Sequence, residues 1–61
     1  MPIVTVKLLE GRTDDQLKNL VQEITNAVEK TTDAKRDAIS VVIEEMKPNH
    51  FGVGGTRKSD Q

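Results

Sequence analysis

The chain has 61 residues, a mass of 6.8 kDa and a formal net charge of -1 at pH 7. This length predicts one small domain spanning residues 1–61. A near-neutral charge and a single aromatic residue, Phe51, exclude a nucleic-acid surface built from a basic field or stacked rings. The longest apolar run, residues 41–43, is too short for a membrane span or a signal peptide, so we expect a cytoplasmic protein.

The hydrophobic core of so short a chain is predicted to be marginal. Burying about 60% of its unfolded surface stabilises it by on the order of 90 kcal/mol. Ordering the backbone and side chains costs roughly as much. The sequence has no cysteine and one histidine, so disulfides are excluded and a structural zinc site is not expected. We therefore expect a homo-oligomer.

Residues 3–9, IVTVKLL, predict a strand whose two faces alternate, with Val4, Val6 and Leu8 on one face. A short turn at residues 10–12 follows. Residues 13–16, TDDQ, then fit a capping box that begins a helix.

The predicted helix carries one apolar stripe at three- and four-residue spacing, formed by Leu17, Leu20, Val21, Ile24, Ala27 and Val28. The stripe fades by residues 31–33. A polar loop at residues 33–37 leads to a second predicted strand at residues 39–46, which stops before Pro48.

A strand, a helix and a second strand predict a β-α-β unit of the α/β class, with parallel strands and a right-handed crossover. One helix covers only one face of the sheet. Since parallel sheets are normally covered on both faces, we expect a second subunit to supply the missing layer.

Three further features are weak functional signals. The glycines of residues 52–55 lack the Gly-Lys-Ser order of a phosphate loop, which favours a flexible turn or a terminal hairpin. Glu44 and Glu45 are neighbours on a strand and point to opposite faces, so a solvated or ion-paired role is favoured over shared catalysis. His50 has no nucleophile or ligand cluster beside it in the sequence, which favours a turn or interface residue.

Residues 1–4 (MPIV), 9–16 (LEGRTDDQ), 43–46 (IEEM) and 50–55 (HFGVGG) together resemble the 4-oxalocrotonate tautomerase family. The similarity lies in their order and spacing and covers nearly the whole chain. It implies a β-α-β protomer with a short C-terminal hairpin, assembled as a homohexamer that is a trimer of dimers.

The same resemblance implies a cofactor-free isomerase that acts on enol and keto forms of 2-hydroxy and 2-oxo acids such as 2-hydroxymuconate. Pro2, exposed once Met1 is removed, would be the catalytic base. Its amine would need a pKa of roughly 7. An apolar surround and nearby cations would lower the pKa toward that value, because both disfavour the protonated amine. Arg12 would bind a carboxylate and draw electron density toward it, and Phe51 would form part of an apolar wall.

One position departs from the family pattern. Ser40 stands where well-studied members carry a second substrate-binding arginine, and Arg36 lies four residues earlier, outside the predicted strand. Both are candidate substrate-binding positions. The alternative function is a non-catalytic oligomeric binding or scaffold protein with a degenerate pocket. Water addition ranks below tautomerisation, because residues 51–55 offer no carboxylate to activate water.

Overall fold

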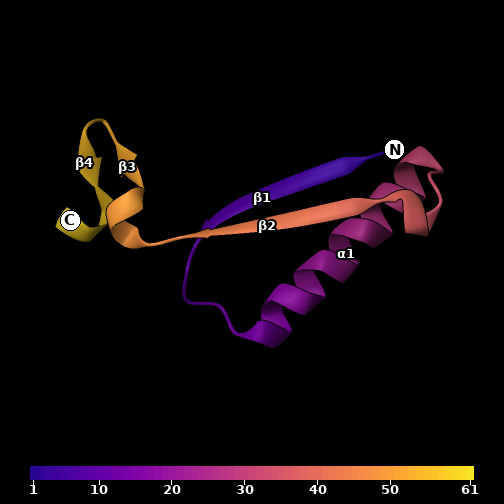
Figure 1. Ribbon diagram of the computed structural model, residues 1–61, viewed down its shortest axis with the longest axis horizontal. Helices are drawn as coiled ribbons and strands as arrows, with labels where there is room; N and C mark the ends of the chain where they lie inside the picture. Colours follow the sequence, from indigo (N-terminus) through magenta and orange to yellow (C-terminus); the bar gives the residue numbers. More distant parts are fainter.

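The computed structural model describes all residues, 1–61 (Figure 1). Two longer strands and one helix form its body, and a small hairpin forms its C-terminal end. In chain order these are β1 (Ile3–Leu9), α1 (Asp14–Thr32), β2 (Ser40–Met46), β3 (Gly52–Val53) and β4 (Thr56–Arg57). Short 3-10 helices occupy Arg36–Ala38, Pro48–His50 and Lys58–Asp60.

Strands β1 and β2 pair in parallel, in a register that runs from Ile3 beside Ser40 to Leu9 beside Met46. Helix α1 connects them and lies along one face of the sheet (Figure 1). This confirms the predicted β-α-β unit with parallel strands. The alternation predicted for β1 is also confirmed, because Val4, Val6 and Leu8 are half-buried while Ile3, Thr5 and Lys7 are exposed.

The capping box predicted at the start of the helix is present. The Thr13 hydroxyl accepts from the backbone N–H of Gln16 over 3.2 Å, and the Gln16 side-chain oxygen accepts from the N–H of Thr13 over 2.9 Å. The helix ends before Asp33, which adopts a left-handed φ of 59°. Of the predicted apolar stripe, Ala27 alone is exposed.

The connection into β2 differs from the prediction by a short helical turn. Residues 36–38 are a 3-10 helix where a polar loop was expected, and β2 begins at Ser40, one residue later than predicted. The reason is the N–H of Ile39, which donates to the carbonyl of Arg36 over 3.1 Å and so closes the turn. Ser40 is therefore the first residue whose N–H bonds across to the β1 side of the sheet.

The glycine-rich segment forms a terminal hairpin, one of its two expected conformations. Gly54 and Gly55 connect β3 to β4 with φ angles of 62° and 89°, which glycine adopts without steric cost. The hairpin lies at the end of the molecule opposite the N-terminus, beyond the end of the β1–β2 sheet (Figure 1).

A single protomer has no buried apolar side chain. Thr25, at 8% exposure, is its one buried residue. The radius of gyration is 14.5 Å, whereas a compact chain of this length has about 10 Å. This open shape agrees with the marginal core predicted from the sequence. No helix of the structure combines the length and apolar character needed to cross a membrane.

Candidate active site

Pro2 lies directly before β1 and is anchored beside the start of β2. Its carbonyl oxygen accepts from the backbone N–H of Ser40 over 3.0 Å. Pro2 is half-buried, while Met1 before it is 93% exposed. The fold therefore brings Pro2 and Ser40, two of the candidate residues, together at one end of the sheet.

Arg12 lies past the other end of the same strand. Gly11, with a φ of 126°, turns the chain out of β1. The Arg12 Nη1 atom then donates to the carbonyl oxygen of Leu9, the last residue of β1, over 3.0 Å. Because β1 spans seven residues at about 3.3 Å each, Arg12 and Pro2 of one protomer lie about 20 Å apart or more.

Phe51 also lies far from Pro2 within one chain. It joins the 3-10 helix at Pro48–His50 to the start of β3, at the hairpin end of the molecule (Figure 1). Its carbonyl oxygen accepts from the N–H of Lys58 over 2.7 Å, and its residue exposure is 38%. The carbonyl bond anchors the backbone at the start of β3, and the residue is exposed in one protomer.

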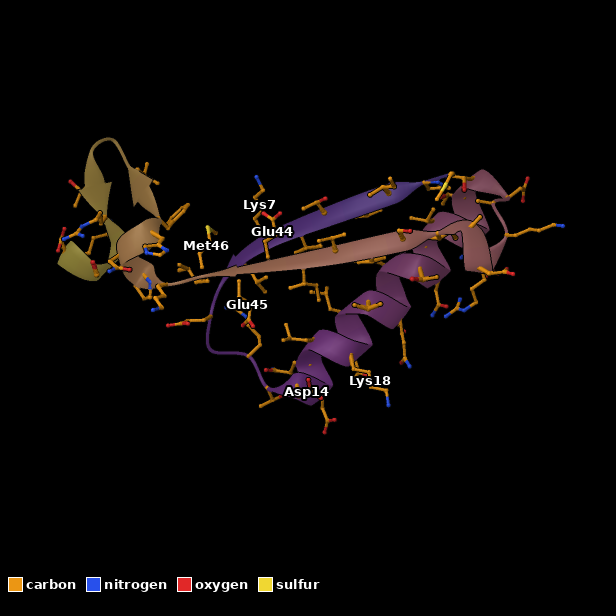
Figure 2. The ribbon with its side chains drawn as sticks, viewed as in Figure 1. Lys7, Asp14, Lys18, Glu44, Glu45 and Met46 are labelled. Atoms are coloured by element: carbon orange, nitrogen blue, oxygen red, sulfur yellow. The ribbon has the colours of Figure 1, made fainter.

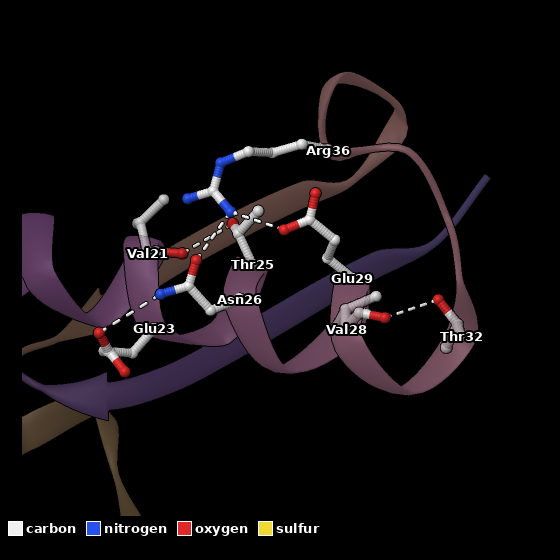
Figure 3. Close-up of polar contacts among 8 residues, drawn as sticks. All are labelled: Val21, Glu23, Thr25, Asn26, Val28, Glu29, Thr32 and Arg36. Atoms are coloured by element: carbon white, nitrogen blue, oxygen red, sulfur yellow. Dashed lines mark hydrogen bonds and ion pairs between the residues drawn. The ribbon is translucent and has the colours of Figure 1, made fainter.

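Arg36 is held against the outer side of helix α1. Its Nη1 atom donates to Asn26 Oδ1 over 2.7 Å and to Glu29 Oε1 over 3.2 Å (Figure 3). These bonds tie the 3-10 turn at Arg36–Ala38 to the last turns of the helix. They direct the Arg36 guanidinium toward α1. Of the two candidate substrate-binding positions, it is therefore Ser40 that lies beside Pro2.

Glu44 and Glu45 lie on opposite faces of β2, as predicted. Glu44 Oε2 lies 4.0 Å from Lys7 Nζ on the neighbouring strand. Figure 2 shows Glu44 and Lys7 on the side away from α1, and Glu45 on the side of α1. The ion-paired role favoured for Glu44 thus has Lys7 as its partner, which the parallel register of β1 and β2 places beside it.

No pocket is present in the single protomer, and no three metal-ligating side chains lie together. Apart from Arg36, the candidate residues form two groups. Pro2 and Ser40 lie at the start of β1 and β2, which we call the Pro2 end. Arg12 and Phe51 follow the other ends of these strands, which we call the Arg12 end. The residues implied for one site thus lie at opposite ends of each protomer.

Comparison with known proteins decides the family. The family described as Tautomerase enzyme matches residues 2–61. A Staphylococcus aureus protein named "Probable tautomerase SAV1363" is 79% identical over 61 residues, covering 100% of both chains. The chain belongs to the tautomerase family.

Solved structures support both the family and the fold. The structure of YwhB, a homologue of 4-oxalocrotonate tautomerase, superposes with a TM-score of 0.95 at 55% identity, covering 98% of each chain. A heterohexamer 4-oxalocrotonate tautomerase from Chloroflexus aurantiacus superposes with a TM-score of 0.92 at 27% identity, covering 98% of this chain and 97% of that one. The resemblance stated from the sequence motifs is thereby confirmed.

Proposed function

We propose that the chain is a cofactor-independent tautomerase that interconverts enol and keto forms of 2-hydroxy and 2-oxo acids such as 2-hydroxymuconate. In the proposed reaction the Pro2 amine, freed by removal of Met1, takes the proton from the 2-hydroxyl oxygen. It returns that proton to a carbon of the conjugated chain. The product is an isomer of the substrate, so no oxidant, reductant or second substrate is consumed.

The observation that carries the proposal is the family membership, combined with a proline directly after Met1. A proline at the start of the mature chain has a secondary amine, held by its ring at the beginning of β1. Contact with apolar groups disfavours the protonated amine and so leaves the base available near neutral pH.

The proposed site is assembled from two copies of the chain. Pro2 and Arg12 lie at opposite ends of β1, so one protomer cannot place both on a single small acid. A two-fold axis that sets two protomers side by side in antiparallel orientation brings the Pro2 end of each beside the Arg12 end of its partner. Two equivalent sites result, one at each end of the pair.

Both outer edges of the two-stranded sheet are unpaired in one protomer, which favours such an arrangement. A homohexamer, as a trimer of these dimers, is the assembly we propose. In each site Arg12 of one copy holds a substrate carboxylate by charge-assisted hydrogen bonds and stabilises the electron density that moves toward it. Phe51 supplies an apolar wall.

Arg36 is left out of the proposed site, because its guanidinium already binds Asn26 and Glu29. Ser40 remains in it, as the position beside Pro2 where one neutral hydroxyl replaces an arginine. A serine at position 40, where the family resemblance implies an arginine, is the observation that favours the second candidate function, a non-catalytic oligomeric binding or scaffold protein.

An assay of the processed protein separates the two candidates. Ketonisation of 2-hydroxymuconate, a dicarboxylate, and of phenylenolpyruvate, a monocarboxylate, is followed by ultraviolet absorbance. We expect turnover of at least one enol acid above the buffer rate, abolished by blocking the Pro2 amine. A processed, oligomeric protein that turns over neither acid would favour the scaffold function.

A further inference from the structure

The sheet face opposite helix α1 carries one ion pair among uncharged side chains. This open face is formed by alternate residues of both strands: Ile3, Thr5, Lys7, Leu9, Ser40, Val42, Glu44 and Met46. Lys7 and Glu44 are direct neighbours in the register, with Nζ and Oε2 4.0 Å apart. Both side chains point away from α1 (Figure 2).

The rows on either side of this pair are uncharged. Thr5 lies beside Val42 in one row, and Leu9 lies beside Met46 in the other. Ile3 and Val42 are 65% and 44% exposed, although apolar side chains of this size are normally buried. The open face therefore has the composition of an interface with one charged pair inside it.

The whole protomer exposes more surface than a compact protein of its mass. Its accessible surface is 4756 Å², whereas a compact protein of this mass exposes about 3,950 Å². The excess of about 800 Å² equals the area that one partner contributes to a standard protein interface. The face also offers both signs of charge, so it can match a second copy of itself.

We propose that the open face packs against a second copy of the chain, and that the Lys7–Glu44 pair lies inside this interface and fixes the register in which the copies meet. The proposal rests on the homo-oligomer of the proposed function and adds the surface and the residues that direct its assembly. On a free protomer the two side chains are 67% and 54% exposed, so the pair contributes little there.

Covering the face changes the energetics of this pair. Removing both charges from water is tolerated while they remain paired, but a single buried charge without its partner is strongly unfavourable. Alignments of the two copies that separate the charges, or that bring like charges together, are penalised in the same way. The pair thus selects one alignment from those that the apolar rows alone would allow.

The test compares Glu44→Gln with Glu45→Gln by sedimentation velocity from nanomolar to micromolar concentration. Glu45 is the matched control, because it is the next residue of β2 and lies on the opposite face (Figure 2). We expect Glu44→Gln to raise the dissociation concentration about 100-fold or more, because Lys7 is left unpaired in the interface. Glu45→Gln should stay within about threefold of the unmodified chain, since it changes an exposed position.

The double variant Lys7→Met/Glu44→Met separates an unpaired charge from a simple folding defect. It removes both charges and keeps long side chains, so we expect its dissociation concentration to return to within about tenfold of the unmodified chain. The proposal is overturned if Glu44→Gln and Glu45→Gln dissociate alike, or if the double variant is no better than Glu44→Gln. An unmodified chain that sediments as a folded monomer would also overturn it.

The same preparations are assayed for enol ketonisation, so that the two proposals can fail separately. An unmodified chain that is oligomeric and active, with indistinguishable glutamate variants, would remove the assembly role of this pair and leave the tautomerase function standing. Rescue of assembly by the double variant, in a protein whose unmodified chain has no ketonisation activity, would support the assembly role of the pair and remove the tautomerase function.

Discussion

The backbone N–H of Ser40 donates a hydrogen bond to the carbonyl oxygen of Pro2 over 3.0 Å, which holds these two residues side by side at one end of the sheet. The N–H of Glu10 makes the corresponding bond at the other end, to Met46 over 2.9 Å. These bonds bracket the seven-residue ladder that separates Pro2 from Arg12. The separation is a property of the fold, and it makes the proposed site depend on a second copy.

Blocking the Pro2 nitrogen should abolish activity. In a chain with an N-terminal extension, or one that retains Met1, this nitrogen is an amide and has no basic lone pair. Because a positioned base contributes about 100- to 10,000-fold, we expect ketonisation to fall by at least about 100-fold. Intact mass identifies the two forms, and circular dichroism checks that both are folded. Equal turnover by the two forms would remove Pro2 from the catalytic role.

Ser40→Arg should shift substrate preference toward dicarboxylates. A charge-assisted hydrogen bond to a carboxylate is worth about 1.5 to 3 kcal/mol, or roughly 10- to 150-fold in kcat/KM. We expect kcat/KM to rise for 2-hydroxymuconate and to rise less for a monocarboxylate enol. The ratio between the two substrates is the measurement. An unchanged ratio in a folded, oligomeric variant would mean that position 40 does not face the substrate.

Arg36→Ala should leave substrate binding unchanged. Its guanidinium makes an exposed ion pair with Glu29, with side-chain exposures of 48% and 46%. We expect KM for the dicarboxylate to stay within about twofold and the free energy of unfolding to fall by less than about 1 kcal/mol. Asn26→Ala, which removes the other partner of Arg36, is the control. A tenfold rise in KM for Arg36→Ala alone would return this residue to the site.

Local sequence patterns predicted most of the fold. The alternation of β1, the Thr13 and Gln16 capping box and the glycine pair of the hairpin each depend on neighbouring residues, and all three are present in the structure. The sequence pattern predicts the start of β2 one residue early, because the apolar side chain of Ile39 fits a strand while its N–H closes a 3-10 turn. Whether Ile39 belongs to the strand or to the turn depends on a backbone hydrogen bond to Arg36, which the side chains of the sequence do not reveal.

The candidate site was less predictable, because its members come from separate parts of the chain. Family resemblance placed Pro2, Arg12 and Phe51 in one site, while the fold separates Pro2 from the other two. The length of the predicted first strand, seven residues, already separates Pro2 from Arg12. How copies of the chain meet depends on exposed surfaces such as the Lys7–Glu44 face, whose pairing requires the register of two distant strands.

Subunit mixing tests the two-copy site most directly. The N-terminally extended chain lacks the base and keeps Arg12, while Arg12→Ala keeps the base and is expected to lose about 10- to 150-fold in kcat/KM. The two are unfolded together in equal amounts and refolded, and each is treated alone as the control. In a mixed pair one site combines an intact Pro2 from one copy with an intact Arg12 from the other. We predict recovery of about a quarter of the unmodified activity, as random two-fold pairing gives. Folded mixed oligomers no more active than the average of the separate controls would contradict a site shared between copies.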